Sequence, residues 1–135
     1  MAIKRILIVD DDEITLKLLE QHLLSAGYPV LKAKNGKQAI ELAKAKKPAL
    51  ILLDVVMPEV DGADVAQFLR DDPATKDIPI IFLTAMLKKE EEQRIGNAIG
   101  KNLFIAKPYD KNKLLEIVRK NIDPKEGEGR KGIVT

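Results

Sequence analysis

Acidic, hydroxyl and ammonium side chains directly follow four of the apolar runs in this 135-residue sequence. Asp10, Asp11 and Asp12 follow residues 6–9, Asp54 follows residues 49–53, Thr84 follows residues 78–83, and Lys107 follows residues 103–106. Carboxylates several ångströms apart repel by roughly 1–4 kcal/mol per pair, so such a cluster holds a proton or a hard cation. Oxygen ligands without His or Cys favour Mg²⁺, with Mn²⁺ as an alternative, over zinc.

A divalent cation, an ammonium, a hydroxyl and a separate carboxylate are together suited to phosphoryl transfer. Asp54 would be the nucleophile and would form an aspartyl phosphate. The cation, Lys107 and Thr84 would neutralise the phosphoryl oxygens.

Each of these features also has a simpler explanation. Residues 10–12 and Thr84 are suited to capping helices. Asp54 is equally suited to beginning a loop, and Lys107 to lying in a surface loop. Their joint occurrence at the ends of strands favours the chemical interpretation.

The apolar pattern predicts five strands that alternate with five helices. Residues 49–54, bounded by Pro48 and Pro58, read as a central strand buried on both faces. We expect Gly27 to end the first helix, a capping box at residues 35–38 to begin the second, and Asp110 to cap the last. The residues expected to face the core include Ile14, Leu16, Leu18, Leu19, Leu23 and Ala26, then Val65, Phe68 and Leu69, and finally Leu115, Val118 and Ile122.

Alternating strands and helices imply an α/β fold with parallel strands and right-handed crossovers. We predict a doubly wound five-stranded parallel sheet of flavodoxin-like type, with strand order 2-1-3-4-5. In that order the ligand crevice lies between strands one and three, at their carboxyl ends. The polar residues named above would then surround one crevice.

Composition narrows the class of protein. The 23 basic and 21 acidic residues give a net charge of +2, and no basic stripe with aromatic residues supports nucleic-acid binding. The absence of cysteine excludes disulfides and thiol chemistry. No apolar run approaches a membrane span and residues 1–5 do not resemble a secretory signal, so we expect a cytoplasmic protein. We expect one domain at residues 1–123 and a flexible tail or linker stub at residues 124–135.

These residues resemble the receiver domain of two-component response regulators. The motifs that carry the resemblance are Val9-Asp10-Asp11, Leu53-Asp54 with Met57-Pro58 and Asp61-Gly62, Leu83-Thr84-Ala85 and Ala106-Lys107-Pro108, in the family's order and spacing over roughly residues 3–122. The resemblance implies that Asp54 accepts a phosphoryl group from the phosphohistidine of a sensor histidine kinase or a phosphotransfer protein. It implies a regulatory phosphoacceptor that catalyses only its own phosphorylation and dephosphorylation.

The same resemblance implies a role for each site residue. Asp11 and Asp54 would bind Mg²⁺ directly with the main-chain carbonyl of Val56, while Asp10 would act mainly through water. Lys107 would pair with the phosphoryl group. Asp12 is a third acid beyond the usual pair, and we assign it to helix capping.

A switch is implied as well. Thr84 would move to the phosphoryl oxygen and Phe104 would turn inward, biasing the face formed by the fourth helix, fifth strand and fifth helix. Phe104 replaces the tyrosine often found there, so the switch would rest on packing, and it can also be read as an ordinary strand aromatic. Val56 and Met86 occupy the positions that tune phosphoryl lifetime. Both are apolar and cannot orient an attacking water, which predicts slow dephosphorylation.

Two alternatives stay open. In a haloacid-dehalogenase-like phosphatase Asp10 would be the nucleophile, but the second acidic pair and room for a substrate cap are missing. A receiver used as a phosphorylation-independent scaffold is the other. The expected partners are a kinase or phosphotransfer protein and a downstream effector or attached output domain, with the chain a monomer or weak dimer.

Overall fold

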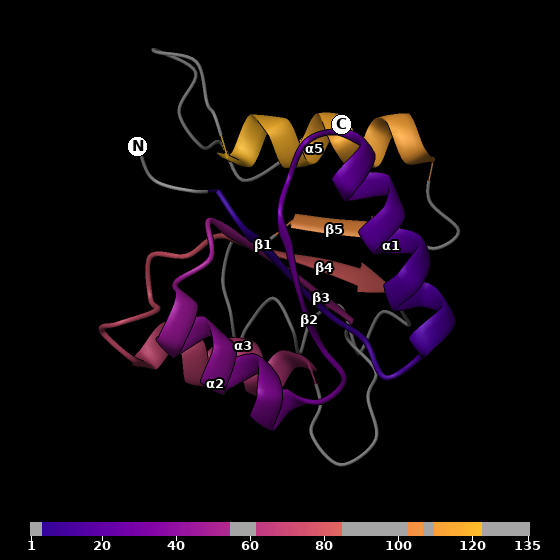
Figure 1. The fold of residues 1–135 in the computed structure, drawn as a ribbon. Coiled ribbons are helices and arrows are strands. Elements are labelled where there is room, and N and C mark those ends of the chain that lie inside the picture. The colour runs from indigo at the N-terminus through magenta and orange to yellow at the C-terminus, as the bar shows by residue number, and fades with distance from the viewer. Residues whose placement is uncertain (1–3, 55–61, 85–102, 107–109, 123–135) are drawn as a thin grey trace.

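The computed structural model describes residues 4–54, 62–84, 103–106 and 110–122 (Figure 1). Within them lie five strands: β1 (Ile6–Val9), β2 (Val30–Ala33), β3 (Leu50–Asp54), β4 (Ile80–Thr84) and β5 (Leu103–Ala106). They form one parallel sheet in the order β2-β1-β3-β4-β5. The predicted flavodoxin-like sheet and its strand order are confirmed.

The described helices are α1 (Glu13–Ser25), α2 (Gly36–Lys46), α3 (Gly62–Asp71) and α5 (Lys111–Ile122). Helices α1 and α5 cover one face of the sheet, and α2 and α3 cover the other (Figure 1). The helices that follow β1 and β3 therefore lie on opposite faces, as the doubly wound prediction requires. The helix predicted between β4 and β5 lies outside the described residues.

Strand periodicity divides the core into two layers. Alternate side chains of a strand point to opposite faces of a sheet, so Leu7 and Val9 pack with α2 and α3 while Ile6 and Ile8 pack with α1 and α5. Residues 50–53 of β3 are fully buried, four apolar side chains in succession. This confirms the prediction of a central strand covered on both faces.

Several residues predicted to face the core do not. Ile14 is 80% exposed and Phe68 is 50% exposed, and Leu18 and Ala26 are also exposed. A helix packed on a sheet buries only a narrow stripe of side chains, which on α1 consists of Leu16, Leu19 and Leu23. Apolar side chains on either side of that stripe face solvent. The Phe68 ring instead lies under the Lys44 ammonium, 5.4 Å from the ring centroid.

The buried stripe of α5 also differs from the prediction by one position. Leu114 and Val118 are fully buried, whereas Leu115 and Ile122 are only partly buried. Asn121, one residue earlier than Ile122, completes the buried side, and its amide donates to the Ile117 carbonyl at 2.8 Å. The helix is thus rotated slightly from the orientation that the apolar residues alone suggested.

The predicted helix ends are confirmed. Gly27 has a φ of 91° just after α1, a conformation that glycine adopts at little cost. Asn35 caps α2 by accepting from the Gln38 N–H at 2.8 Å. The other half of the predicted capping box differs, because the Gln38 side chain accepts from the Lys34 N–H at 2.9 Å and not from the Asn35 N–H. Asp110 caps α5 by accepting from the Asn112 N–H at 2.7 Å. Among the helices that the structure describes, none is long and apolar enough to cross a membrane.

Helix α2 ends at a strained residue. Lys47 has a φ of 45° and a ψ of 67°, and its N–H donates to the Ala43 carbonyl at 3.0 Å. Left-handed backbone costs a residue with a Cβ roughly 1–2 kcal/mol.

Replacing Lys47 with glycine is therefore expected to stabilise the fold. The Lys47→Gly variant should gain about 0.5–1 kcal/mol in free energy of unfolding, because glycine adopts this backbone without the Cβ penalty. Chemical denaturation measures the change. Ala45→Gly, two residues earlier within α2, is the control and should lose about as much. Equal loss from both variants would contradict the prediction.

Candidate metal centre

Three carboxylates meet at the carboxyl edge of the sheet. Strands β1 and β3 are adjacent and parallel with Val9 opposite Leu53, so the next residues, Asp10 and Asp54, emerge side by side. Asp11 follows Asp10, and carboxylate oxygens of Asp10, Asp11 and Asp54 all lie within 4.8 Å of one another. The structure thus brings together acids that are separated by more than forty positions in the sequence.

The burial of this cluster raises the free-energy cost of its negative charge. Asp10 is 1% exposed and Asp54 is 8% exposed, while Asp11 is open to solvent. Carboxylates this close repel, and the repulsion is screened least where water is excluded. A bound cation would relieve it.

The three acids suit a small hard cation. Mg²⁺ holds oxygen ligands at about 2.0–2.1 Å, so opposite ligands lie about 4.2 Å apart. The carboxylate oxygens lie within 4.8 Å of one another, close enough for all three residues to approach a single ion. Mg²⁺ usually takes one or two carboxylates and keeps waters or phosphate oxygens on its other positions. The exposed side of Asp11 leaves room for them.

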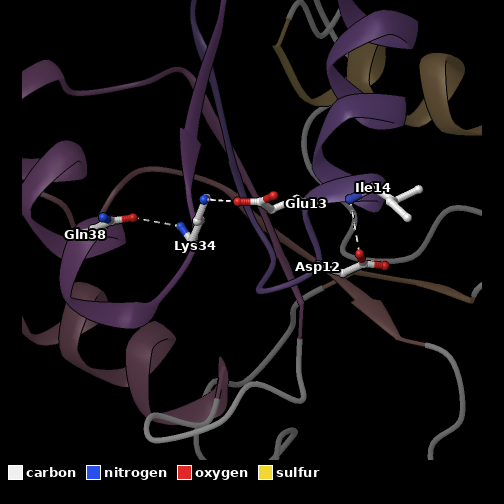
Figure 2. Close-up of polar contacts among 5 residues, drawn as sticks. All are labelled: Asp12, Glu13, Ile14, Lys34 and Gln38. Atoms are coloured by element: carbon white, nitrogen blue, oxygen red, sulfur yellow. Dashed lines mark hydrogen bonds and ion pairs between the residues drawn. The ribbon is translucent and has the colours of Figure 1, made fainter.

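Main-chain contacts hold Asp10 in the cluster. The Asp10 N–H donates to the Ala33 carbonyl at 3.1 Å, and the Asp12 N–H donates to Asp10 Oδ1 at 2.9 Å. The Asp12 carboxylate in turn accepts from the Ile14 N–H at 3.1 Å (Figure 2) and from the Thr15 hydroxyl at 2.8 Å. Asp12 is therefore the N-cap of α1, as the sequence predicted.

Beside the cluster, an ion pair joins α1 to the segment after β2. The Lys34 ammonium contacts the Glu13 carboxylate (Figure 2). Lys34 holds the pKa of Glu13 below its usual value, first through the hydrogen bond and then through its charge. Sequence reasoning missed this pair, because its members lie 21 positions apart and no local pattern links them.

The backbone also places Thr84 at this edge. Thr84 is the last residue of β4 and pairs with Ala106, the last residue of β5, while Asp54 pairs with Leu83. Phe104 lies within β5 opposite Phe82. Lys107, Val56 and Met86 fall outside the described residues.

Comparisons with known proteins agree with this architecture. The family model described as the response regulator receiver domain matches residues 6–119. The polar-differentiation response regulator DivK of Brucella anthropi is 35% identical over 116 residues, which cover 86% of this chain and 94% of DivK.

Solved structures show the same likeness. Vibrio cholerae chemotaxis protein CheY4 superimposes with a TM-score of 0.81 and 29% identity over 88% of this chain and 98% of that one. The receiver domain of a sensor histidine kinase from Pseudomonas aeruginosa, solved with magnesium coordinated in its active-site cleft, gives a TM-score of 0.81 and 30% identity over 90% of this chain and 98% of that one.

The fold and the acidic edge define a doubly wound domain with a cluster of three carboxylates, suited to a hard cation, at its topological switch point. The chain belongs to the receiver domain family of two-component response regulators. Domains of this family are regulatory phosphoacceptors that work with histidine kinases and output domains, and they bind Mg²⁺ at an acidic pocket.

Magnesium should stabilise this protein through the acidic cluster. At 100 times its Kd, a ligand that binds only the folded state adds about 2.7 kcal/mol to the free energy of unfolding. We expect Mg²⁺ to raise the melting midpoint of the wild type by several degrees, and Asp11→Asn to lose most of that rise. Without Mg²⁺, Asp11→Asn should melt higher than the wild type, because one repulsion is gone.

Asp12→Asn is the matched control for this measurement. Asparagine caps helices as well as aspartate does, so this variant should keep the Mg²⁺ response. Differential scanning calorimetry with and without Mg²⁺ reports both quantities. A full Mg²⁺ response in Asp11→Asn would contradict the assignment.

Proposed function

We propose that this chain accepts a phosphoryl group on Asp54 in a Mg²⁺-dependent reaction, from a phosphohistidine of a sensor histidine kinase or phosphotransfer protein. The observation that carries the proposal is the position of Asp54, nearly buried at the end of β3 with the oxygens of Asp10 and Asp11 within 4.8 Å. An Asp54 oxygen attacks phosphorus as the bond from phosphorus to the imidazole nitrogen breaks. The departing imidazole keeps the electron pair of that bond.

The remaining roles belong to the same proposal. Asp11 and Asp54 hold the ion with the main-chain carbonyl of Val56, and Asp10 acts through water. When bound, Mg²⁺ neutralises charge on the phosphoryl oxygens. Lys107 supplies a second positive charge. This role is supported by the sequence, in which Lys107 directly follows Ala106, the last residue of β5, and by the fact that β5 ends at the same edge as β3 and β4.

We further propose that phosphorylation changes the packing of β4 and β5. Thr84 ends β4 and pairs with Ala106 of the neighbouring strand β5, two residues beyond Phe104, which supports a coupling between the two positions. Phenylalanine has no hydroxyl to donate, so the switch works through packing. The responding face is that of the fourth helix, β5 and α5.

We also propose a wider assignment, which rests on the sequence and on the family match. The domain comprises residues 1–123, residues 124–135 form a tail or linker, and the output is a separate effector or an attached domain. We propose a monomer or weak dimer in the cytoplasm, which suits a chain without cysteine. The family match leaves the haloacid-dehalogenase-like alternative without support.

Phosphorylation by acetyl phosphate tests the proposal directly. With Mg²⁺, the wild type should gain the mass of one phosphoryl group, and peptide mapping should place it on Asp54. Asp54→Asn should gain none. Asp64→Asn, which removes an exposed carboxylate from the first turn of α3, should react like the wild type.

Failure of the wild type to react under these conditions would instead favour the phosphorylation-independent scaffold. Modification at Asp10 would favour the phosphatase mechanism. Intact-mass spectrometry distinguishes these outcomes in one series.

The phosphorylated state should be long-lived. Val56 and Met86 present no polar group to an attacking water, and loss of water positioning costs several tenfold steps in rate, which gives a half-life on the order of hours. Val56→Asn should shorten it at least about tenfold. Leu24→Asn, an exposed apolar position on α1, is the control. A wild-type half-life of seconds, measured by phosphate release, would refute the expectation.

A further inference from the structure

The Glu13–Lys34 ion pair joins the two segments that hold Asp10 (Figure 2). Lys34 directly follows Ala33, whose carbonyl accepts the Asp10 N–H at 3.1 Å. Glu13 directly follows Asp12, whose N–H donates to the Asp10 carboxylate at 2.9 Å. The ion pair therefore links, through side chains, the two segments whose backbone groups form hydrogen bonds with Asp10.

The first turn of α1 moves together with Asp12. The Leu16 N–H donates to the Asp12 carbonyl at 3.0 Å, and the Asp12 carboxylate accepts from the Ile14 N–H and the Thr15 hydroxyl. A displacement of this turn would carry the Asp12 N–H with it. The hydrogen bond that orients the Asp10 carboxylate would change as a result.

Hydrogen bonds hold the backbone of Lys34 in place. Its N–H donates to Gln38 Oε1 at 2.9 Å (Figure 2), and the Gln38 N–H donates to Asn35 Oδ1 at 2.8 Å. These bonds tie the Lys34 backbone to the capped start of α2. Lys34 can therefore hold Glu13 from a segment whose own position is set by another helix.

We propose that Lys34 is a positioning residue for the metal centre, acting through Glu13 on the first turn of α1 and thereby on the Asp10 carboxylate. The inference rests on the proposed function, because it requires the centre to bind Mg²⁺. Both side chains of the pair are largely exposed, and exposed ion pairs have modest energies. The expected change in Mg²⁺ affinity is accordingly about two- to fivefold.

A purely electrostatic role would give a different pattern. If only charge mattered, Lys34→Gln would tighten Mg²⁺ binding by removing a positive charge, and Glu13→Gln would weaken it. If Lys34 is a positioning residue, Lys34→Gln and Glu13→Gln should both weaken Mg²⁺ binding, and by a similar factor. A positioning role also predicts that the double variant binds no more weakly than either single one, since either change breaks the pair.

A second ion pair provides the control. Lys32 contacts Glu20 at 3.1 Å and likewise joins β2 to α1, with its lysine exposed to a similar degree. Glu20 lies in the middle of α1, away from the Asp12 N–H. Lys32→Gln removes the same charge from the same strand region and should leave the Mg²⁺ dissociation constant within about 1.5-fold of the wild type.

Calorimetric Mg²⁺ titration of the full chain, combined with hydrogen exchange at the Asp12 amide, tests the inference. Lys34→Gln and Glu13→Gln should each raise the Mg²⁺ dissociation constant about two- to fivefold and speed Asp12 amide exchange in the free protein. Lys34→Arg should restore both values. Melting midpoints without Mg²⁺ should be alike for Lys34→Gln and Lys32→Gln, which separates positioning from general stability.

The possible outcomes separate this inference from the proposed function. If Lys34→Gln binds Mg²⁺ as tightly as the wild type or more tightly, or if Lys32→Gln weakens binding equally, the inference fails while Asp54 chemistry stands. If the wild type binds no Mg²⁺, both fail.

Discussion

The parallel pairing of β1 with β3 places Asp10 and Asp54 side by side, and the candidate chemistry of the domain depends on this contact. Val9 lies opposite Leu53, so the residues that follow them, Asp10 and Asp54, place their carboxylates at the same level of the sheet edge. The chain leaves β1 toward one face of the sheet and β3 toward the other. No helix has to cross the edge between them, which is why ligands reach open α/β sheets at such switch points.

Grouping carboxylates at the sheet edge lowers the stability of the folded domain and favours the binding of a cation. Close carboxylates with little exposure destabilise the folded state by mutual repulsion and loss of solvation. The fully buried strands on either side supply the compensating apolar contacts, from Ile6–Val9 of β1 and from residues 50–53 of β3. A cluster built this way suits a divalent cation, because folding has already brought the charges together.

The polar contacts around the candidate metal centre differ in how far they are exposed to solvent. Asp10 is held by two main-chain hydrogen bonds, Asp12 by its role as helix cap, and Glu13 by an ion pair in solvent. The buried bonds set the geometry, since unsatisfied buried groups are costly. The exposed pair can only adjust it, since solvent screens its energy.

Local patterns in the sequence were enough to identify the strands, most helix ends and the capping roles of Asp12, Asn35 and Asp110. These features depend on short-range periodicity and on hydrogen bonds between near neighbours. The parallel fold and the grouping of polar residues at one edge also followed, because alternation of strands and helices admits few topologies.

Only the tertiary structure decided which side of each helix meets the sheet and which distant charges pair. Ile14 and Phe68 satisfy the helical pattern yet face solvent, because packing on a sheet admits a narrower stripe than the sequence offers. Glu13 and Lys34 carry no local signal, since their contact arises from the pairing of β2 with β1. Sequence periodicity determined which elements form. The register and rotation of those elements in the packed core determined which side chains meet.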